Sequence, residues 1–132
     1  MSPRAKRIAA VLYGIPFVWV GIQHFVNPEV FVPIVPSYLG WPEFWVHITG
    51  WTEIALGVAI MLPRFRKPAA ALMVAQLVLL YLANLNMWMN DIAFEGHRFG
   101  NLWHAGRLVV QGLLIAIALW LRKDPVTETA TP

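Results

Sequence analysis

The chain has 132 residues and a formal net charge of +3; 58% of its residues are hydrophobic and only 13% are charged. This composition is too apolar for an ordinary water-soluble domain and is typical of a membrane protein. The absence of cysteine excludes disulfides, thiol redox relays and thiolate metal sites within the chain.

Four segments are long enough to cross the hydrocarbon core of a bilayer, which takes about 20 apolar residues as a helix. They are residues 7–26, 44–62, 68–89 and 102–121. We therefore predict an all-α fold in which residues 1–123 form a single transmembrane four-helix bundle. The polar stretch 124–132 is expected to be a disordered cytoplasmic tail.

The link between the first two segments differs from an ordinary loop. It contains Pro28, Pro33, Pro36 and Pro42 among many apolar side chains. We expect a short helical or extended segment, broken by its prolines, that lies in the outer interface or dips back to roof the bundle. The next link, residues 63–67, predicts a tight basic turn, and Pro68 suits the first turn of a new helix.

The basic residues gather at the ends of the predicted helices. Eight of the ten Lys and Arg residues form three clusters: Arg4, Lys6 and Arg7; Arg64, Arg66 and Lys67; Arg122 and Lys123. Basic residues in short loops stay on the cytoplasmic side, so all three clusters predict a cell-membrane protein with both termini inside. The positive charge is thus an orientation signal, and nucleic-acid binding is not expected.

Glu53 and Arg107 are the two charged residues that fall inside the long apolar stretches. At about 1.5 Å per residue, Glu53 would lie about 14 Å and Arg107 about 9 Å below the outer face. A charge near the bilayer centre costs about 2.5 to 3.5 kcal/mol on insertion scales, so such residues usually face a partner, a cavity or a ligand.

Other polar residues share the outer half of the predicted bundle. Helical spacing places His104, Arg107 and Gln111 on one face of the last segment, while Glu53 shares its face with Gly50 and Gly57. We expect these stripes to converge on one outward-facing cleft under the Pro-rich link. The candidate ligand-binding residues are His24, His47, Glu53, Asn84, His104, Arg107 and Gln111.

A purely structural role for the charged pair is the alternative, since opposite charges can fix helix register. Two charges about 4 Å apart gain only about 4 kcal/mol at an effective dielectric of 20, whereas inserting both costs about 5 to 7 kcal/mol. That balance favours a hydrated or ligand-occupied site. A metal site is not expected, because His24, His47 and His104 are not spaced as ligands on one helix.

The sequence resembles the DoxX-like family of small membrane proteins with four transmembrane helices. The resemblance is carried by the stretches GIQHFVNPEVFVPIVPSYL (21–39), GWTEIALGVAIMLPRFRKPAA (50–70), ANLNMW (83–88) and RLVVQGLLIAIALW (107–120). It implies a four-helix bundle and a link to quinone-coupled sulfur oxidation, to redox complexes or to disulfide handling. The lack of cysteine argues against a thiol-dependent branch and leaves quinone or lipid binding open.

Two functions follow as hypotheses. The first is binding of a lipophilic small molecule, such as a quinone, lipid or similar amphiphile, in the outer cleft, with the protein acting alone or as a subunit of a redox complex. The second is a non-enzymatic assembly or scaffolding factor, or a homo-oligomer, whose partner face would include Ala69, Ala70 and Ala71. No catalytic residues and no metal or nucleotide cofactor are predicted, so enzymatic activity by the chain alone is not expected.

Overall fold

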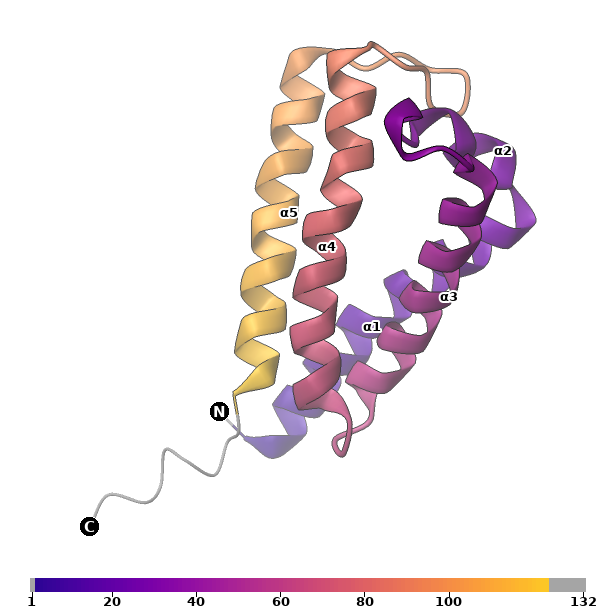
Figure 1. Ribbon diagram of the computed structural model, residues 1–132. Coiled ribbons are helices and arrows are strands. Elements are labelled where there is room, and N and C mark those ends of the chain that lie inside the picture. The colour runs from indigo at the N-terminus through magenta and orange to yellow at the C-terminus, as the bar shows by residue number, and fades with distance from the viewer. Residues whose placement is uncertain (1, 124–132) are drawn as a thin grey trace.

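The computed structural model describes residues 2–123, which form four long helices and three short ones (Figure 1). The long helices are α1 (Pro3–Val26), α3 (Pro42–Met61), α4 (Arg66–Met89) and α5 (Asn101–Arg122). Each is long and apolar enough to cross a membrane, and each overlaps one predicted segment. The predicted all-α fold with four membrane-length helices is confirmed. The predicted tail, 124–132, lies outside the described residues.

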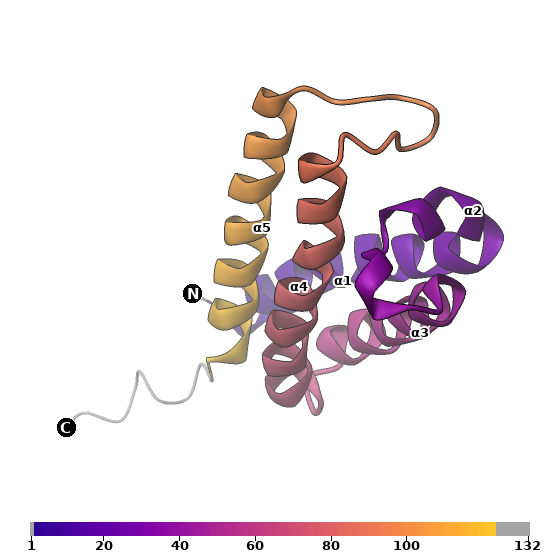
Figure 2. The same cartoon turned by 45° about the horizontal axis from the view of Figure 1, so that its top comes forward.

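The long helices are arranged as two pairs. α1 packs along α3, and α4 packs along α5, while the principal contact between the pairs joins α3 to α4. Figures 1 and 2 show the pairs meeting at one end and diverging toward the other. We call the end where the pairs meet, which also holds the start of α1 and the end of α5, the closed end; the other is the open end.

The α1–α3 crossing is close because glycines line it. An added Cβ on Gly50 would lie 2.7 Å from Cβ of His24, and one on Gly57 would lie 2.9 Å from the carbonyl oxygen of Gly14. Both distances are too short for a real side-chain atom, so only glycine permits the two backbones to approach this closely. The stripe of Gly50, Glu53 and Gly57 expected from the sequence is the buried face of α3.

The closed end holds the core. Ala10 of α1, Ile60 of α3 and Met73 of α4 are fully buried there, and Leu121 of α5 joins them. The hydroxyl of Tyr13 donates to the carbonyl oxygen of Leu114 at 2.9 Å, which ties α1 to α5. All four long helices thus contribute to one packed cluster.

The expectation that small residues at the start of α4 form a face for another protein is wrong for Ala69 and Ala70. Ala70 is fully buried and Ala69 is 3% exposed, and both belong to the core of this chain. Their small side chains let α4 pack against its own neighbours, so they are not free for an outside partner.

The Pro-rich link caps the open end. It forms α2 (Pro28–Phe31) and two turns of 3-10 helix, η1 (Val32–Ile34) and η2 (Ser37–Leu39). The Asn86 side chain of α4 donates to the carbonyl oxygen of Ile34 at 3.0 Å, and the Trp45 indole of α3 donates to that of Leu39 at 3.4 Å. The link is therefore anchored to both pairs of helices, as short helical pieces separated by prolines.

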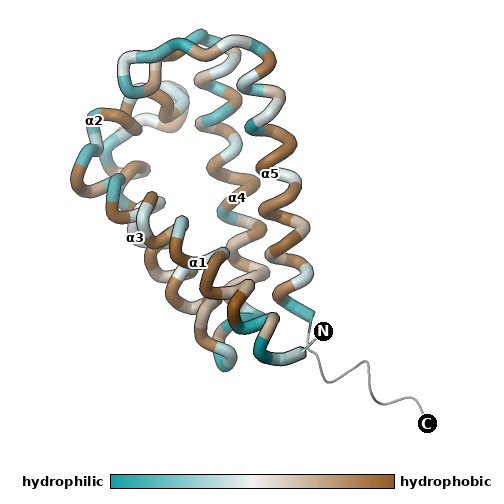
Figure 3. Tube along the Cα trace, turned by 180° about the vertical axis from the view of Figure 1, so that it is seen from behind, coloured by the Kyte–Doolittle hydropathy of each residue, from teal (hydrophilic) through white to brown (hydrophobic). Residues whose placement is uncertain are grey.

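The outer surface of the long helices is apolar. Figure 3 shows hydrophobic residues along their length and hydrophilic ones concentrated toward both ends of the bundle. On α5 the exposed side chains include Leu108, Val109, Val110 and Leu113. Such a surface is compatible with contact with lipid and would be costly in water.

Candidate functional site

A cleft of about 720 Å³ lies between α3 and α4, in the space opened by the divergence of the two pairs. Its roof comes from the Pro-rich link, including Phe31, Ile34 and Pro36, and from Phe94 in the connection between α4 and α5. Most of its lining is aliphatic. A few polar side chains are set into this apolar lining: His24, Thr49, Thr52, Glu53, Gln76, Asn84 and Arg107.

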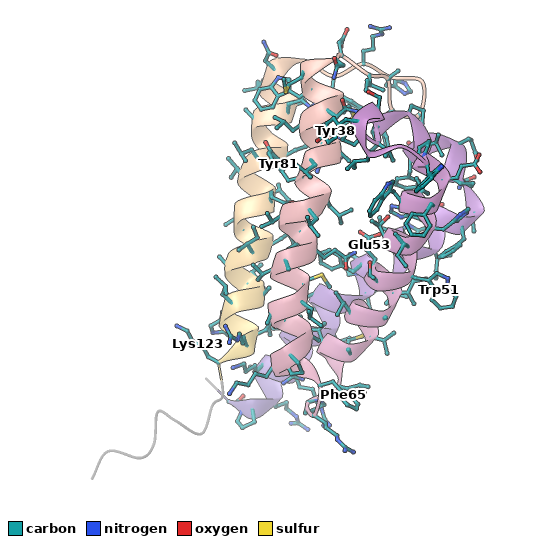
Figure 4. All side chains as sticks on the ribbon, in the orientation of Figure 1. Tyr38, Trp51, Glu53, Phe65, Tyr81 and Lys123 are labelled. Atoms are coloured by element: carbon teal, nitrogen blue, oxygen red, sulfur yellow. The ribbon has the colours of Figure 1, made fainter. Side chains whose placement is uncertain are left out.

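Glu53 is the most deeply buried charged residue of the cleft, with 4% of its surface exposed. Figure 4 shows its side chain in the space between α3 and α4, while the neighbouring Trp51 points away from that space. Its carboxylate oxygen Oε2 lies 3.2 Å from Nδ1 of His24 on α1. The helical face that carries Gly50 and Gly57 therefore also directs the carboxyl group toward α1 and the cleft.

His24 is held by three contacts. Nδ1 lies 2.8 Å from the carbonyl oxygen of Val20, one turn earlier on α1, and the imidazole ring stacks on Phe31 of the roof with 3.9 Å between ring centroids. Because Nδ1 carries at most one hydrogen, it cannot fully serve both the Val20 carbonyl and the Glu53 carboxylate. The shorter contact goes to the carbonyl, which leaves Oε2 of Glu53 without a hydrogen bond.

Gln76 of α4 lines the same cleft as Glu53 of α3. Its amide nitrogen donates to the carbonyl oxygen of Thr49 at 3.3 Å, which links α4 to α3. Its amide oxygen Oε1 is buried without a hydrogen-bond partner. Within the described residues, Oε1 of Gln76 and Oε2 of Glu53 are the two buried side-chain nitrogen or oxygen atoms that have no hydrogen-bond partner. Both are acceptors, and both belong to residues that line the same cleft.

Arg107 and Asn84 bring donors to the same lining. Arg107, half-buried on α5, reaches the cleft past α4, and its Nη1 lies 3.7 Å from the sulfur of Met87. In the part of the chain that the structure describes, no ion pair joins Arg107 to Glu53. The two charges expected to be partners thus line one cleft without touching, because α3 and α5 belong to different pairs.

Three of the candidate residues lie outside the cleft lining. His47 is exposed on α3 and stacks against Phe25 at 5.5 Å between centroids, and His104 is buried beneath Trp88, also at 5.5 Å. The Gln111 amide donates to the carbonyl oxygen of Leu77 and so links α5 to α4. The structure brings together His24, Glu53, Asn84 and Arg107.

Gln76 is the site residue that sequence reasoning missed. It stands in the inner half of its predicted span, away from the outer polar residues, so depth alone argued against it. The signal was its type: an amide in a run of aliphatic residues is costly in a membrane unless it is hydrogen-bonded. No group of three side chains suited to hold a metal ion occurs within residues 2–123.

The cleft opens sideways, between α3 and α4. Exposed residues at its margin include Ile48 and Ala55 on α3, and Leu72 and Leu79 on α4. These positions lie within helices that are long and apolar enough to cross a membrane.

A family model described as a domain of unknown function, DUF8561, matches residues 3–122, nearly the whole of the described chain. No curated protein matches the chain. No solved structure matches it either.

Proposed function

This chain belongs to the DUF8561 family, and we propose that it binds a lipophilic small molecule with a polar head in the cleft between α3 and α4. The observation that carries the proposal is that two buried acceptors without a hydrogen bond, Oε2 of Glu53 and Oε1 of Gln76, belong to residues that line one cavity. An unsatisfied buried acceptor costs about 1–3 kcal/mol. A ligand that donates hydrogen bonds to these atoms would remove that cost.

The polar head of the ligand carries at least one hydrogen-bond donor. A hydroxyl group, as in a lipid alcohol or in the quinol form of a quinone, can donate its one hydrogen to either acceptor. Arg107 and Asn84 add donors on the same lining, which suits a carbonyl oxygen elsewhere on the head. The quinone and lipid ligands expected from the likeness to DoxX-like proteins both fall within this chemistry, and that likeness is itself part of the proposal.

The rest of the ligand is apolar. The lining is mainly aliphatic, and the volume of about 720 Å³ falls within the range of about 300–1,000 Å³ typical of small-molecule sites. Leu79, Ala55 and the other marginal residues would contact a hydrocarbon chain that extends toward the bilayer.

The orientation in the membrane is a further part of the proposal. Both described ends of the chain lie at the closed end together with the basic clusters, so the positive-inside rule places this end in the cytoplasm. The cleft would then lie in the outer half of the bilayer, beneath the Pro-rich roof.

The test is recovery of the ligand from gently purified protein. Extraction and mass spectrometry should yield about one lipophile per chain, because the site is a single cavity of ligand size. Glu53→Gln and Gln76→Leu each change one acceptor and should lower the recovered amount at least about fivefold. Glu43→Gln is the matched control, because Glu43 is an exposed carboxylate on the same helix outside the cleft lining.

A second variant tests the volume of the site without altering its polar groups. Ala75→Phe places a ring in the cleft and should displace the ligand while the protein stays folded by circular dichroism. If wild-type protein carries no stoichiometric lipophile, or if Glu53→Gln, Gln76→Leu and Ala75→Phe all retain it as Glu43→Gln does, the proposal is wrong.

A further inference from the structure

A second cavity, of about 650 Å³, lies at the closed end, far from Glu53. Seven of its eleven lining residues are Lys or Arg. They come from the start of α1, the start of α4 and the end of α5, segments distant in sequence that the fold brings together (Figure 1). No carboxylate of the described residues lines this cavity.

Lys6 is the most deeply buried cation of this basic cavity. It is only 8% exposed, its ammonium group donates to the carbonyl oxygen of Lys123, and it lies 5.5 Å from the ring centroid of Trp120. An ammonium group has three N–H donors, and the carbonyl takes one. A charge withdrawn this far from water normally has an ionic partner, and no described carboxylate provides one.

Arg66 is oriented by the protein in the same way. Its Nε donates to the carbonyl oxygen of Ile60 at 3.0 Å and its Nη2 to that of Met61 at 3.4 Å, so it caps the end of α3. A guanidinium has five N–H donors, so donors remain after these two bonds are made. Arg66 is therefore held in place with hydrogen-bonding capacity left for another acceptor.

The helix ends add to this positive field. α1 and α4 both begin at the cavity, and neither has an acidic residue in its first turn. The N-terminus of a helix carries a partial positive charge that acidic residues normally offset, whereas here the first turns bring Arg4 and Arg66. An anion in the cavity would interact favourably with both helix ends and with the side chains around them.

We propose that this cavity binds the phosphate group of an anionic phospholipid. Phosphate matches the remaining donors of Lys6 and Arg66, and basic pockets between membrane helices are known to take such head groups. The lining also includes Ile8 and Leu121, and the exposed apolar surface of α1 continues from Ile8 to Leu12. That surface offers a path for the acyl chains, which a free phosphate ion would not use.

The test compares lipids and variants on the purified full-length protein. Native mass spectrometry after exchange into phosphatidylglycerol should show the lipid retained, and phosphatidylcholine should be retained at least about tenfold less. The double variant Arg7→Gln with Arg122→Gln removes two cavity cations and should lower phosphatidylglycerol retention at least about tenfold. Arg64→Gln is the control, because Arg64 lies at the same end but outside the cavity lining.

Three outcomes would overturn the proposal. Equal retention of phosphatidylglycerol and phosphatidylcholine by wild type would mean that the cavity does not select an anion. An equal loss in Arg64→Gln and the double variant would assign the effect to the overall charge of this end. Displacement of the lipid by an equal concentration of inorganic phosphate would identify a site for the free ion. Size-exclusion chromatography and circular dichroism should show that all variants remain folded.

Discussion

The closed and open ends of the bundle are built from the same four helices but differ in how the helices pack. At the closed end, alanine, aliphatic and aromatic side chains from all four helices fill one core, with Ile60 and Met73 fully buried. At the open end the pairs separate, and the space holds a cleft with buried polar groups of incomplete hydrogen bonding. The apolar core thus lies at one end and the cleft with the buried polar groups at the other.

The largest difference between the ends should appear when one aliphatic side chain is truncated on either side of their boundary. Leu77, 3% exposed in the core, and Leu79, 66% exposed at the cleft margin, lie two residues apart on α4. Leu77→Ala should lower the free energy of unfolding by at least about 2 kcal/mol, because the truncated side chain leaves a cavity that the neighbouring helices do not fill. Leu79→Ala should change stability by less than about 0.5 kcal/mol.

Equilibrium unfolding in detergent micelles measures both Leu→Ala variants against wild type. Because the substitution and the helix are the same, helix propensity cancels between them. Equal destabilisation by the two variants would contradict the division into a packed end and an open end.

The long helices were predictable because each is a run of apolar residues bounded by prolines, glycines or charges. The buried face of α3 was also predictable, since Gly50, Glu53 and Gly57 lie on one side of the helix. The pairing of α1 with α3 was not, because apolar stripes do not specify which neighbour they meet. For the same reason Glu53 and Arg107 could be assigned to one cleft, while their lack of contact had to come from the structure.

Gln76 illustrates the other limit of sequence reasoning. Depth along the membrane normal describes only one coordinate of a residue's position. Gln76 shares a cleft with Glu53 because α3 and α4 are inclined to each other, and this inclination changes which positions of the two helices lie opposite one another. Such inclination depends on side-chain volumes at the crossing, including the glycines of α1 and α3. A sequence read helix by helix contains no direct signal for it.

The next effect in size concerns the close crossing of α1 and α3 near the closed end. Gly57→Ala would place its Cβ 2.9 Å from the carbonyl oxygen of Gly14 and 2.9 Å from Cγ2 of Val18, so the helices must separate. We expect a loss of about 1–3 kcal/mol. Gly112→Ala on α5 is the control, because nothing lies within 4 Å of its added Cβ.

The same unfolding measurement separates the steric effect from helix propensity. Both Gly→Ala changes favour a helix by about 1 kcal/mol, so Gly112→Ala should stabilise the protein or leave it unchanged. A stabilising Gly57→Ala would show that the α1–α3 contact is looser than the structure has it, and that the closed end extends less far along this pair.

The smallest expected effect concerns the hydrogen bond that joins the pairs at the closed end. Tyr13→Phe removes the hydroxyl that donates to the carbonyl oxygen of Leu114 at 2.9 Å, and should cost about 0.5–1.5 kcal/mol in unfolding experiments. The cost is modest because that carbonyl lies within α5 and can keep its helical partner. Tyr81→Phe on α4 is the matched control; Tyr81 makes no hydrogen bond to the described residues, so its hydroxyl should contribute little.

Since the Tyr13 hydroxyl joins α1 to α5, its loss should also let the two pairs of helices move more freely, which faster amide hydrogen exchange at the closed end would report. Exchange that rises equally in Tyr81→Phe would mean that the Tyr13 bond does not hold the pairs together.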